Sequence, residues 1–270
     1  MIARIGSGVV LGIAALLLVF LGGIPYDLAI IALAALALRE FYGLAARLLS
    51  VASPFADAAV GVTVALLAVL SFAPDPRWRI VAAVLALIFS LGGLLFVRGE
   101  AVAVRWVVTV AGVVYIGVLC APLLLLRGGA SIEGRAWVLV AAAITWGADT
   151  SAYVVGRSLG RTPFFPRISP KKTVEGSVGG VVGGMVAAIL VARVAGLQQP
   201  GPLVTLVGLT GTIAAQAGDL VESLFKRQAG VKDAGTLIPG HGGVLDRVDS
   251  LLFVGGLTYC WRLLLDSSYT

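Results

Sequence analysis

The sequence predicts an all-α integral membrane protein with about nine transmembrane helices and two long cytoplasmic loops. Of its 270 residues, 59% are hydrophobic and 13% are charged, with a mean hydropathy of +1.01, whereas about 25% of the residues in soluble domains are charged. Apolar stretches of about 20 residues, enough to cross a bilayer as a helix, recur along the chain. The alternating polar and apolar pattern of a membrane barrel is absent. Backbone polar groups in lipid are then satisfied within helices.

The predicted transmembrane helices take up most of the chain. They lie at 6–23, 25–44, 54–73, 79–97, 103–126, 136–156, 176–196, 202–221 and 248–265. The first has a basic end at Arg4 like a signal peptide, but the next apolar stretch follows without a clear cleavage site, so we interpret it as a retained helix. Cys120 and Cys260 both fall inside predicted helices, and two buried thiols do not suggest a metal site.

The basic residues predict the orientation. The long polar segments 157–175 and 222–247 flank the seventh and eighth helices, so both lie on one side of the membrane. If that side is the cytoplasm, the N-terminus is inside, the C-terminus is outside, and fourteen of the 20 Lys and Arg residues face inward, as the positive-inside rule requires. The net charge of +6 therefore needs no nucleic-acid partner. We expect a multi-pass protein of the inner (cytoplasmic) membrane.

The chemistry is unevenly distributed. Residues 1–135 read as hydrophobic helices with short connections, suited to packing and to dimer contacts, whereas residues 136–270 form the predicted catalytic region. Gly176, Gly180 and Gly184 recur every four residues at the start of the seventh helix. Such spacing lets neighbouring membrane helices approach closely, and packing is the favoured interpretation over ligand contact.

The strongest group of candidate functional residues lies at 219–249. Asp219, Ser223 and Lys226 share one helical face, and so do Asp246 and Asp249. Three carboxylates at a membrane interface are suited to Mg²⁺, which binds through carboxylates and substrate phosphates. The neighbouring cations suit phosphate oxygens; they are Lys226, Arg227, Lys232 and Arg247. The alternative is a set of interfacial ion pairs, but ionisable residues within membranes are usually functional.

Two further segments carry weaker signals. Lys171, Lys172 and Thr173, close after Ser169, precede a predicted helix whose N-terminal amides favour an anion. The alternative is a basic loop that only obeys the positive-inside rule. Asp149, in the sixth predicted helix, is either a substrate contact or a hydrogen-bonding group between helices.

A glycine-rich segment separates the carboxylates. Gly240, Gly242 and Gly243 flank His241, the only histidine in the sequence. Glycines allow the backbone to approach a phosphate or a base closely. His241 is either a structural hydrogen-bonding residue or a substrate contact, and no base is required because a phosphate is already a nucleophile.

Together these segments resemble the phosphatidate cytidylyltransferases (CDP-diacylglycerol synthases). Twelve positions match that family's signature with its spacing: Ser223, Lys226, Arg227, Lys232, Asp233, Pro239, His241, Gly242, Gly243, Asp246, Arg247 and Asp249. The segments 149–157 and 169–176 are similar to the family as well. The resemblance is specific over about 145–250, and in the first half it extends only to hydrophobic helical character.

The resemblance implies a Mg²⁺-dependent reaction at the inner face of the membrane, in which phosphatidic acid attacks CTP to give CDP-diacylglycerol and pyrophosphate. With the carboxylate group described above, we expect catalytic roles for Asp219, Lys226, Asp246 and Arg247. Asp219, Asp246 and Asp249 would hold the metal, with room for a second cation. The implied substrate-binding residues are Asp149, Ser169, Lys171, Lys172, Thr173, Ser223, Arg227, Lys232, His241, Gly242 and Gly243. It also implies a homodimer.

Two other functions stay open at this stage. One is a related membrane enzyme that uses CTP on another lipid acceptor, as a polyprenol kinase or an ether-lipid cytidylyltransferase does. The other is a transporter with intramembrane carboxylates. A transporter should place its ionisable residues near the bilayer midplane, whereas here they gather at one interface beside basic loops.

Overall fold

The computed structural model describes residues 2–49, 55–73, 75, 77–93, 95, 101–129, 131–238 and 242–265, with side chains from residue 8 onward. Among these residues all the regular secondary-structure elements are helices, which confirms the all-α prediction. The elements are α1 (Ile2–Leu21), α2 (Gly23–Leu49), α3 (Ala56–Phe72), α4 (Arg77–Gly93), α5 (Val102–Gly112), the π-helical η2 (Val113–Val118), α6 (Leu119–Arg127), α7 (Ile132–Leu159), α8 (Val174–Val194), α9 (Gly201–Gln228) and α10 (Leu245–Leu265).

The segments α5, η2 and α6 form one continuous helical rod, Val102–Arg127. Pro122 lies inside α6. Because proline lacks an N–H and its ring crowds the carbonyl four residues earlier, the regular hydrogen-bond ladder is disturbed at Val118, the last residue of η2. The π-helical turn therefore falls where the sequence breaks the α-helical pattern.

Six of the described rods are long and apolar enough to cross a membrane: α2, Val102–Arg127, α7, α8, α9 and α10. Two apolar segments, Gly8–Leu21 and Ala56–Phe72, are shorter. The structure thus confirms a multi-pass helical membrane protein, while the number of nine membrane crossings stays a prediction.

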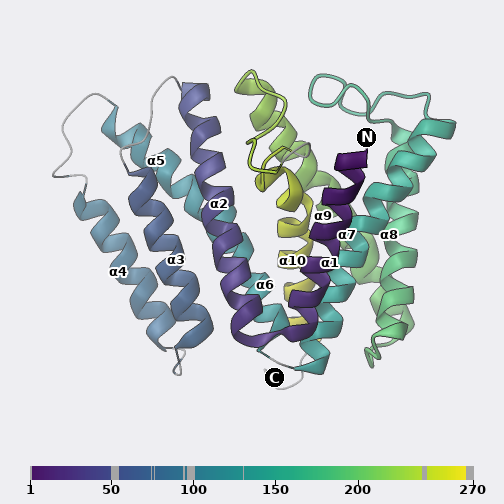
Figure 1. Ribbon diagram of the computed structural model, residues 1–270, viewed down its shortest axis with the longest axis horizontal. Coiled ribbons are helices and arrows are strands. Elements are labelled where there is room, and N and C mark those ends of the chain that lie inside the picture. Colours follow the sequence, from purple (N-terminus) through teal and green to yellow (C-terminus); the bar gives the residue numbers. More distant parts are fainter. Residues whose placement is uncertain are drawn as a thin grey trace.

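The two long loops are shorter than the sequence predicts, covering 160–173 and 229–244 rather than 157–175 and 222–247. The reason is that α7 and α9 each contain 28 residues, more than the roughly 20 needed to span a bilayer. Both helices continue beyond the apolar stretch before the chain turns. Both loops lie at the end of the bundle where α1 begins (Figure 1).

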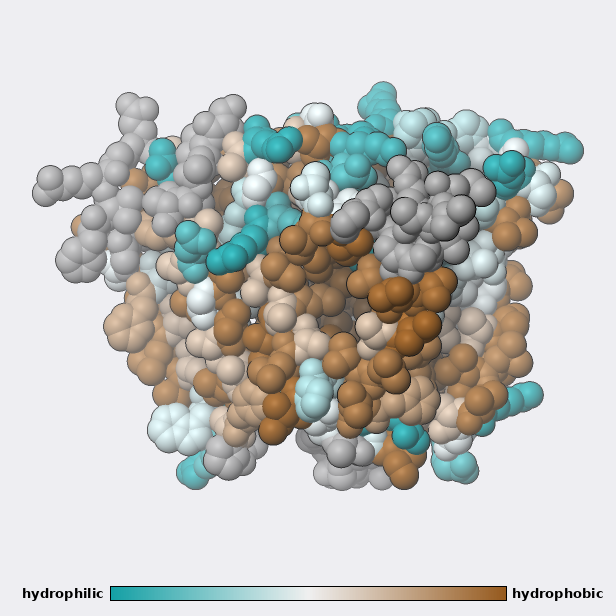
Figure 2. All heavy atoms as spheres, viewed as in Figure 1, coloured by the Kyte–Doolittle hydropathy of each residue, from teal (hydrophilic) through white to brown (hydrophobic). Residues whose placement is uncertain are grey.

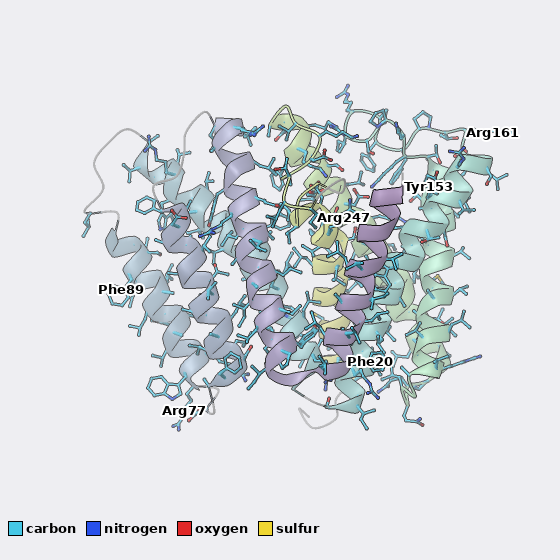
Figure 3. All side chains as sticks on the ribbon, viewed as in Figure 1. Phe20, Arg77, Phe89, Tyr153, Arg161 and Arg247 are labelled. Carbon is cyan, nitrogen blue, oxygen red and sulfur yellow. The ribbon has the colours of Figure 1, made fainter. Side chains whose placement is uncertain are left out.

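Hydrophobic side chains form a band across the middle of the bundle, and hydrophilic residues gather at the loop end (Figure 2). Arg161 and Arg247 lie toward that end, whereas Arg77 lies at the opposite end (Figure 3). This distribution has the asymmetry expected when one end carries most of the positive charge.

Glycines bring α7, α8 and α9 into close contact. A Cβ atom at Gly176 would lie 2.9 Å from the carbonyl oxygen of Ala152, and one at Gly180 would lie 3.1 Å from that of Ala148. A Cβ atom at Gly184 would overlap the hydroxyl of Thr212 on α9. The glycine stripe predicted from the sequence therefore serves helix packing, because larger residues would force these helices apart.

Helices of the first half of the chain pack against those of the second. Rings from α2, η2, α9 and α10 meet at centroid distances between 5.7 and 6.2 Å; they belong to Phe41, Tyr115, Phe225 and Phe253. A Cβ atom at Gly255 of α10 would overlap Leu123 of α6. This packing holds α9 and α10, whose loop-end parts carry the charged residues, against α2 and η2.

Candidate active site

Charged side chains from four parts of the chain line one polar cavity of about 310 Å³ at the loop end of the bundle. The residues come from α7, α9, α10 and the loop before α10: Asp149, Asp219, Glu222, Lys226, Arg227, Lys232, Asp233, Asp246, Arg247, Asp249 and Ser250. Eight of the site residues predicted from the sequence are therefore brought together. Carboxylates and cations share this cavity, so each can offset the charge of the other.

Asp246 is the most extensively bonded of these carboxylates. Its Oδ1 atom accepts a hydrogen bond of 2.6 Å from the ammonium group of Lys226. Its Oδ2 atom accepts from the backbone N–H groups of Gly243 at 2.7 Å and Ala234 at 2.8 Å. The carboxylate thus links the middle of the loop before α10 to its last residues, and it lines the polar cavity.

Lys226 lies between two carboxylates. Besides Asp246, its Nζ atom lies 2.5 Å from an oxygen of Glu222, which is four residues earlier on α9. The Glu222 side chain is only 1% exposed, and among the described residues neither of its oxygens has an aligned hydrogen-bond partner. This buried carboxylate therefore depends on the Lys226 charge.

Asp219 is held by a residue of its own helix, α9, and by a residue of the loop that precedes α8. Lys172 forms an ion pair with its Oδ2 atom, and the Ser223 hydroxyl donates to Oδ1 at 3.3 Å. Both side chains of the ion pair are about one-third exposed. The ion pair attaches the loop that carries Lys172 directly to the charged face of α9. Helical spacing in the sequence does not predict this contact.

A second cavity, of about 450 Å³, lies between α7, α8 and α9. Its walls combine small and aromatic residues with polar and charged ones: Ala148, Asp149, Ala152, Tyr153, Gly156, Arg157, Phe164, Lys171, Lys172, Thr173, Gly176, Ser177, Gln216 and Asp219. Asp149 and Asp219 line both cavities. The two spaces therefore adjoin at these two carboxylates.

The remaining predicted residues shape the loops. Thr173 caps α8 by accepting from the Gly176 N–H at 3.1 Å. The carbonyl of Ser169 accepts from the Lys172 N–H at 3.1 Å. Arg227 donates to the carbonyls of Ile168 and Val231, so it links the two loops to each other.

In the glycine-rich segment, Gly242 has φ of +81°, a conformation that glycine adopts without strain. A Cβ atom there would also lie 2.7 Å from the Asp246 carboxylate. Gly243 contributes the backbone N–H that Asp246 accepts. His241, together with residues 239 and 240, lies outside the described residues.

The donor chemistry of Asp219, Asp246 and Asp249 fits Mg²⁺, since all three side chains offer carboxylate oxygens within one cavity. Over the described ranges, however, no three such side chains are arranged as a ready metal cluster. In this structure Lys226 and two amides hold Asp246, and Lys172 holds Asp219.

Sequence reasoning missed two acidic residues near the site. Glu222 had an available signal, because it is three residues after Asp219 and four before Lys226 on one helical face. Glu40, on α2, accepts hydrogen bonds from the backbone at the start of α10. No local pattern could reveal it, because about 200 residues separate it from its partners.

Comparison with known proteins shows the family of this chain. The sequence model of the cytidylyltransferase family matches residues 2–265. The chain is 34% identical over 261 residues to a protein of Bacillus subtilis (strain 168) named phosphatidate cytidylyltransferase, with 95% of each chain covered.

Two further relatives with the same name match over about half their length. The one from a Synechocystis species is 48% identical over 129 residues, which is 47% of this chain and 43% of the relative. The one from Brucella abortus is 41% identical over 150 residues, or 55% and 54%. These matches confirm the family resemblance inferred from the signature residues. Because the family model extends across almost the whole sequence, this chain belongs to the cytidylyltransferase family and is a nucleotidyltransferase.

Proposed function

We propose that this protein transfers the cytidylyl group of CTP to phosphatidic acid, giving CDP-diacylglycerol and pyrophosphate. The observation that carries the proposal is the junction of two cavities at Asp149 and Asp219. One cavity is lined by charged residues, and the other, which lies among membrane helices, is lined by small and aromatic residues as well as by charged and polar ones. A nucleotide and a lipid phosphate can meet at such a junction without the lipid leaving the membrane.

The reaction needs no covalent enzyme intermediate. A phosphate oxygen of phosphatidic acid forms a bond to the α-phosphorus of CTP, and the bond from that phosphorus to the oxygen bridging to the β-phosphate breaks. The electron pair of the broken bond leaves with pyrophosphate. The demands on the protein are positioning of two polyanions and stabilisation of the charge that grows on the leaving group.

The cations of the site are suited to these demands. Lys226 and Arg247 line the polar cavity, where the triphosphate would bind, and we assign them to the leaving pyrophosphate. Lys171 and Lys172 line the second cavity, and we assign them to the lipid phosphate. Arriving phosphates would compete with Asp219 and Asp246 for Lys172 and Lys226, which would free carboxylate oxygens.

Asp219, Asp246 and Asp249 are the residues that would hold Mg²⁺, with space for a second cation. A bound divalent ion there would supply positive charge to the phosphate oxygens. We further propose that the loop end faces the cytoplasm, where CTP is available, and that the protein is a homodimer in the inner membrane. The clustering of hydrophilic residues at the loop end supports the orientation (Figure 2).

The test is an assay of the purified full-length protein in detergent with Mg²⁺, CTP labelled in the α-phosphate and phosphatidic acid. We expect equal amounts of CDP-diacylglycerol and pyrophosphate. A polyprenol substrate supplied in a parallel reaction distinguishes the alternative, because a lipid kinase would release CDP and leave no label on the lipid. Transfer to an ether-linked lipid phosphate in preference to phosphatidic acid would change the proposed acceptor. Asp57→Asn, an exposed residue on α3, serves as the control variant.

A further inference from the structure

Glu40 lies on α2, in the half of the chain where the sequence shows little chemistry, and it contacts the start of α10. Its Oε1 atom accepts from the Val244 N–H at 3.0 Å, and its Oε2 atom accepts from the Leu245 N–H at 2.8 Å. These two N–H groups belong to the residue just before α10 and to its first residue, where donors have no partner within the helix. A carboxylate at this position also interacts favourably with the helix dipole.

Two glycines make room for this side chain. A Cβ atom at either Gly235 or Gly243 would overlap the Glu40 carboxylate. Neither glycine has a positive φ, so backbone conformation does not explain why glycine is present. The close approach of Glu40 does explain it. The carboxylate is held between the middle of the loop that precedes α10, at Gly235, and the end of that loop, at Gly243.

Asp246 binds the same two parts of the loop. Its Oδ2 atom accepts from Gly243 and Ala234, which are next to the residues that Glu40 contacts. Asp246 and Arg247 are the second and third residues of α10. Their positions in the polar cavity therefore depend on where α10 begins, and Glu40 binds the two amides that define that beginning.

We propose that Glu40 is a positioning residue for the cytidylyl transfer, acting through the loop at 229–244 and the first turn of α10 to place Asp246 and Arg247. The catalytic site is then completed by the N-terminal half of the chain. This inference rests on the proposed function for its effect on turnover, but the contact itself can be tested without substrate.

The first test compares Glu40→Gln with the wild-type enzyme. Glutamine keeps the size of the side chain but directs an NH₂ group at one of the two N–H donors, so one hydrogen bond is lost. We expect kcat to fall at least about tenfold, with KM for each substrate changing less than about threefold, because the residues it positions act in the transition state. Asp57→Asn, which makes the same chemical change on α3, should leave kcat unaltered.

Amide hydrogen exchange gives a readout that does not depend on activity. In Glu40→Gln the amides of Val244 and Leu245 should exchange faster than in the wild type. Unchanged exchange together with wild-type kcat would overturn the proposal. A lower melting temperature with wild-type kcat measured well below it would also overturn it, because Glu40 would then be only a structural residue. If the wild type fails to use phosphatidic acid, the function proposed above fails, while exchange still tests the contact.

A double-mutant cycle tests the close contact between Gly235 and Glu40. Gly235→Ala should displace Glu40 and lower kcat to a similar extent as Glu40→Ala. The double variant should be no worse than Glu40→Ala alone, because the added methyl group then has room. If the two effects multiply instead, Gly235 and Glu40 act independently and the positioning contact is refuted.

Discussion

The ammonium group of Lys226 on α9 lies 2.6 Å from the carboxylate of Asp246 on α10. This ion pair joins a residue expected to bind phosphate to one expected to bind metal. Its side chains are 12% and 6% exposed, so water screens the pair weakly. The pair holds two membrane helices together at the point where the substrates are expected to react.

Asp246→Asn should abolish turnover, lowering kcat by at least about 100-fold, as removal of a preorganised electrostatic group does. The amide is a poorer ligand for a cation, and it can no longer offer two acceptor oxygens to Lys226 and the backbone amides of Gly243 and Ala234. Pyrophosphate release by the purified variant measures the effect. Wild-type turnover at ordinary Mg²⁺ concentration would refute the metal assignment.

Lys226→Met should destabilise the protein by about 3–5 kcal/mol, because it leaves Glu222 buried without its counter-charge. Adding Glu222→Gln to that variant should recover part of the lost stability. Neither variant should turn over normally. Thermal unfolding in one detergent measures the stabilities, and a double variant less stable than the single one would contradict the pairing of these residues.

Arg127 offers a contrast at the opposite end of the bundle. Its guanidinium donates to the carbonyls of Val19, Gly129 and Ser131, and the residue is 2% exposed. Arg127→Ala should cost at least about 2 kcal/mol of stability, since hydrogen bonds from a buried charge are lost.

Turnover of this variant at low temperature should stay near the wild-type value, because Arg127 is remote from both cavities. Arg127→Lys should restore little, since an ammonium group cannot reproduce the planar fork of donors. A kcat that falls while the melting temperature is unchanged would show that this end of the bundle affects catalysis.

The predicted orientation can be checked with single cysteines in a background where Cys120 and Cys260 are replaced. Cysteines at the exposed positions Arg161 and Gln228 should be labelled by a membrane-impermeant maleimide only when the cytoplasmic face is accessible. A cysteine at Gln198, between α8 and α9, should be labelled from the other side. Labelling of Arg161→Cys and Gln228→Cys from opposite sides would contradict the shared loop end.

The sequence alone determined the membrane class and the positions of most helices, and it predicted eight of the residues that line the polar cavity. Apolar stretches must be helical in lipid because their backbone has no other partner, so composition was sufficient. Helical spacing placed Asp219, Ser223 and Lys226 on one face, and the family signature marked Asp246 and Arg247. These inferences depend on neighbours within a few residues or on a family motif read along the chain.

Only the tertiary structure decided which charges are paired. The ion pair of Lys172 with Asp219 and the burial of Glu222 beside Lys226 depend on how α8, α9 and α10 pack. The contact of Glu40 with Val244 and Leu245 joins positions about 200 residues apart. The energy of such contacts depends on distance and burial in three dimensions, and local sequence patterns carry neither.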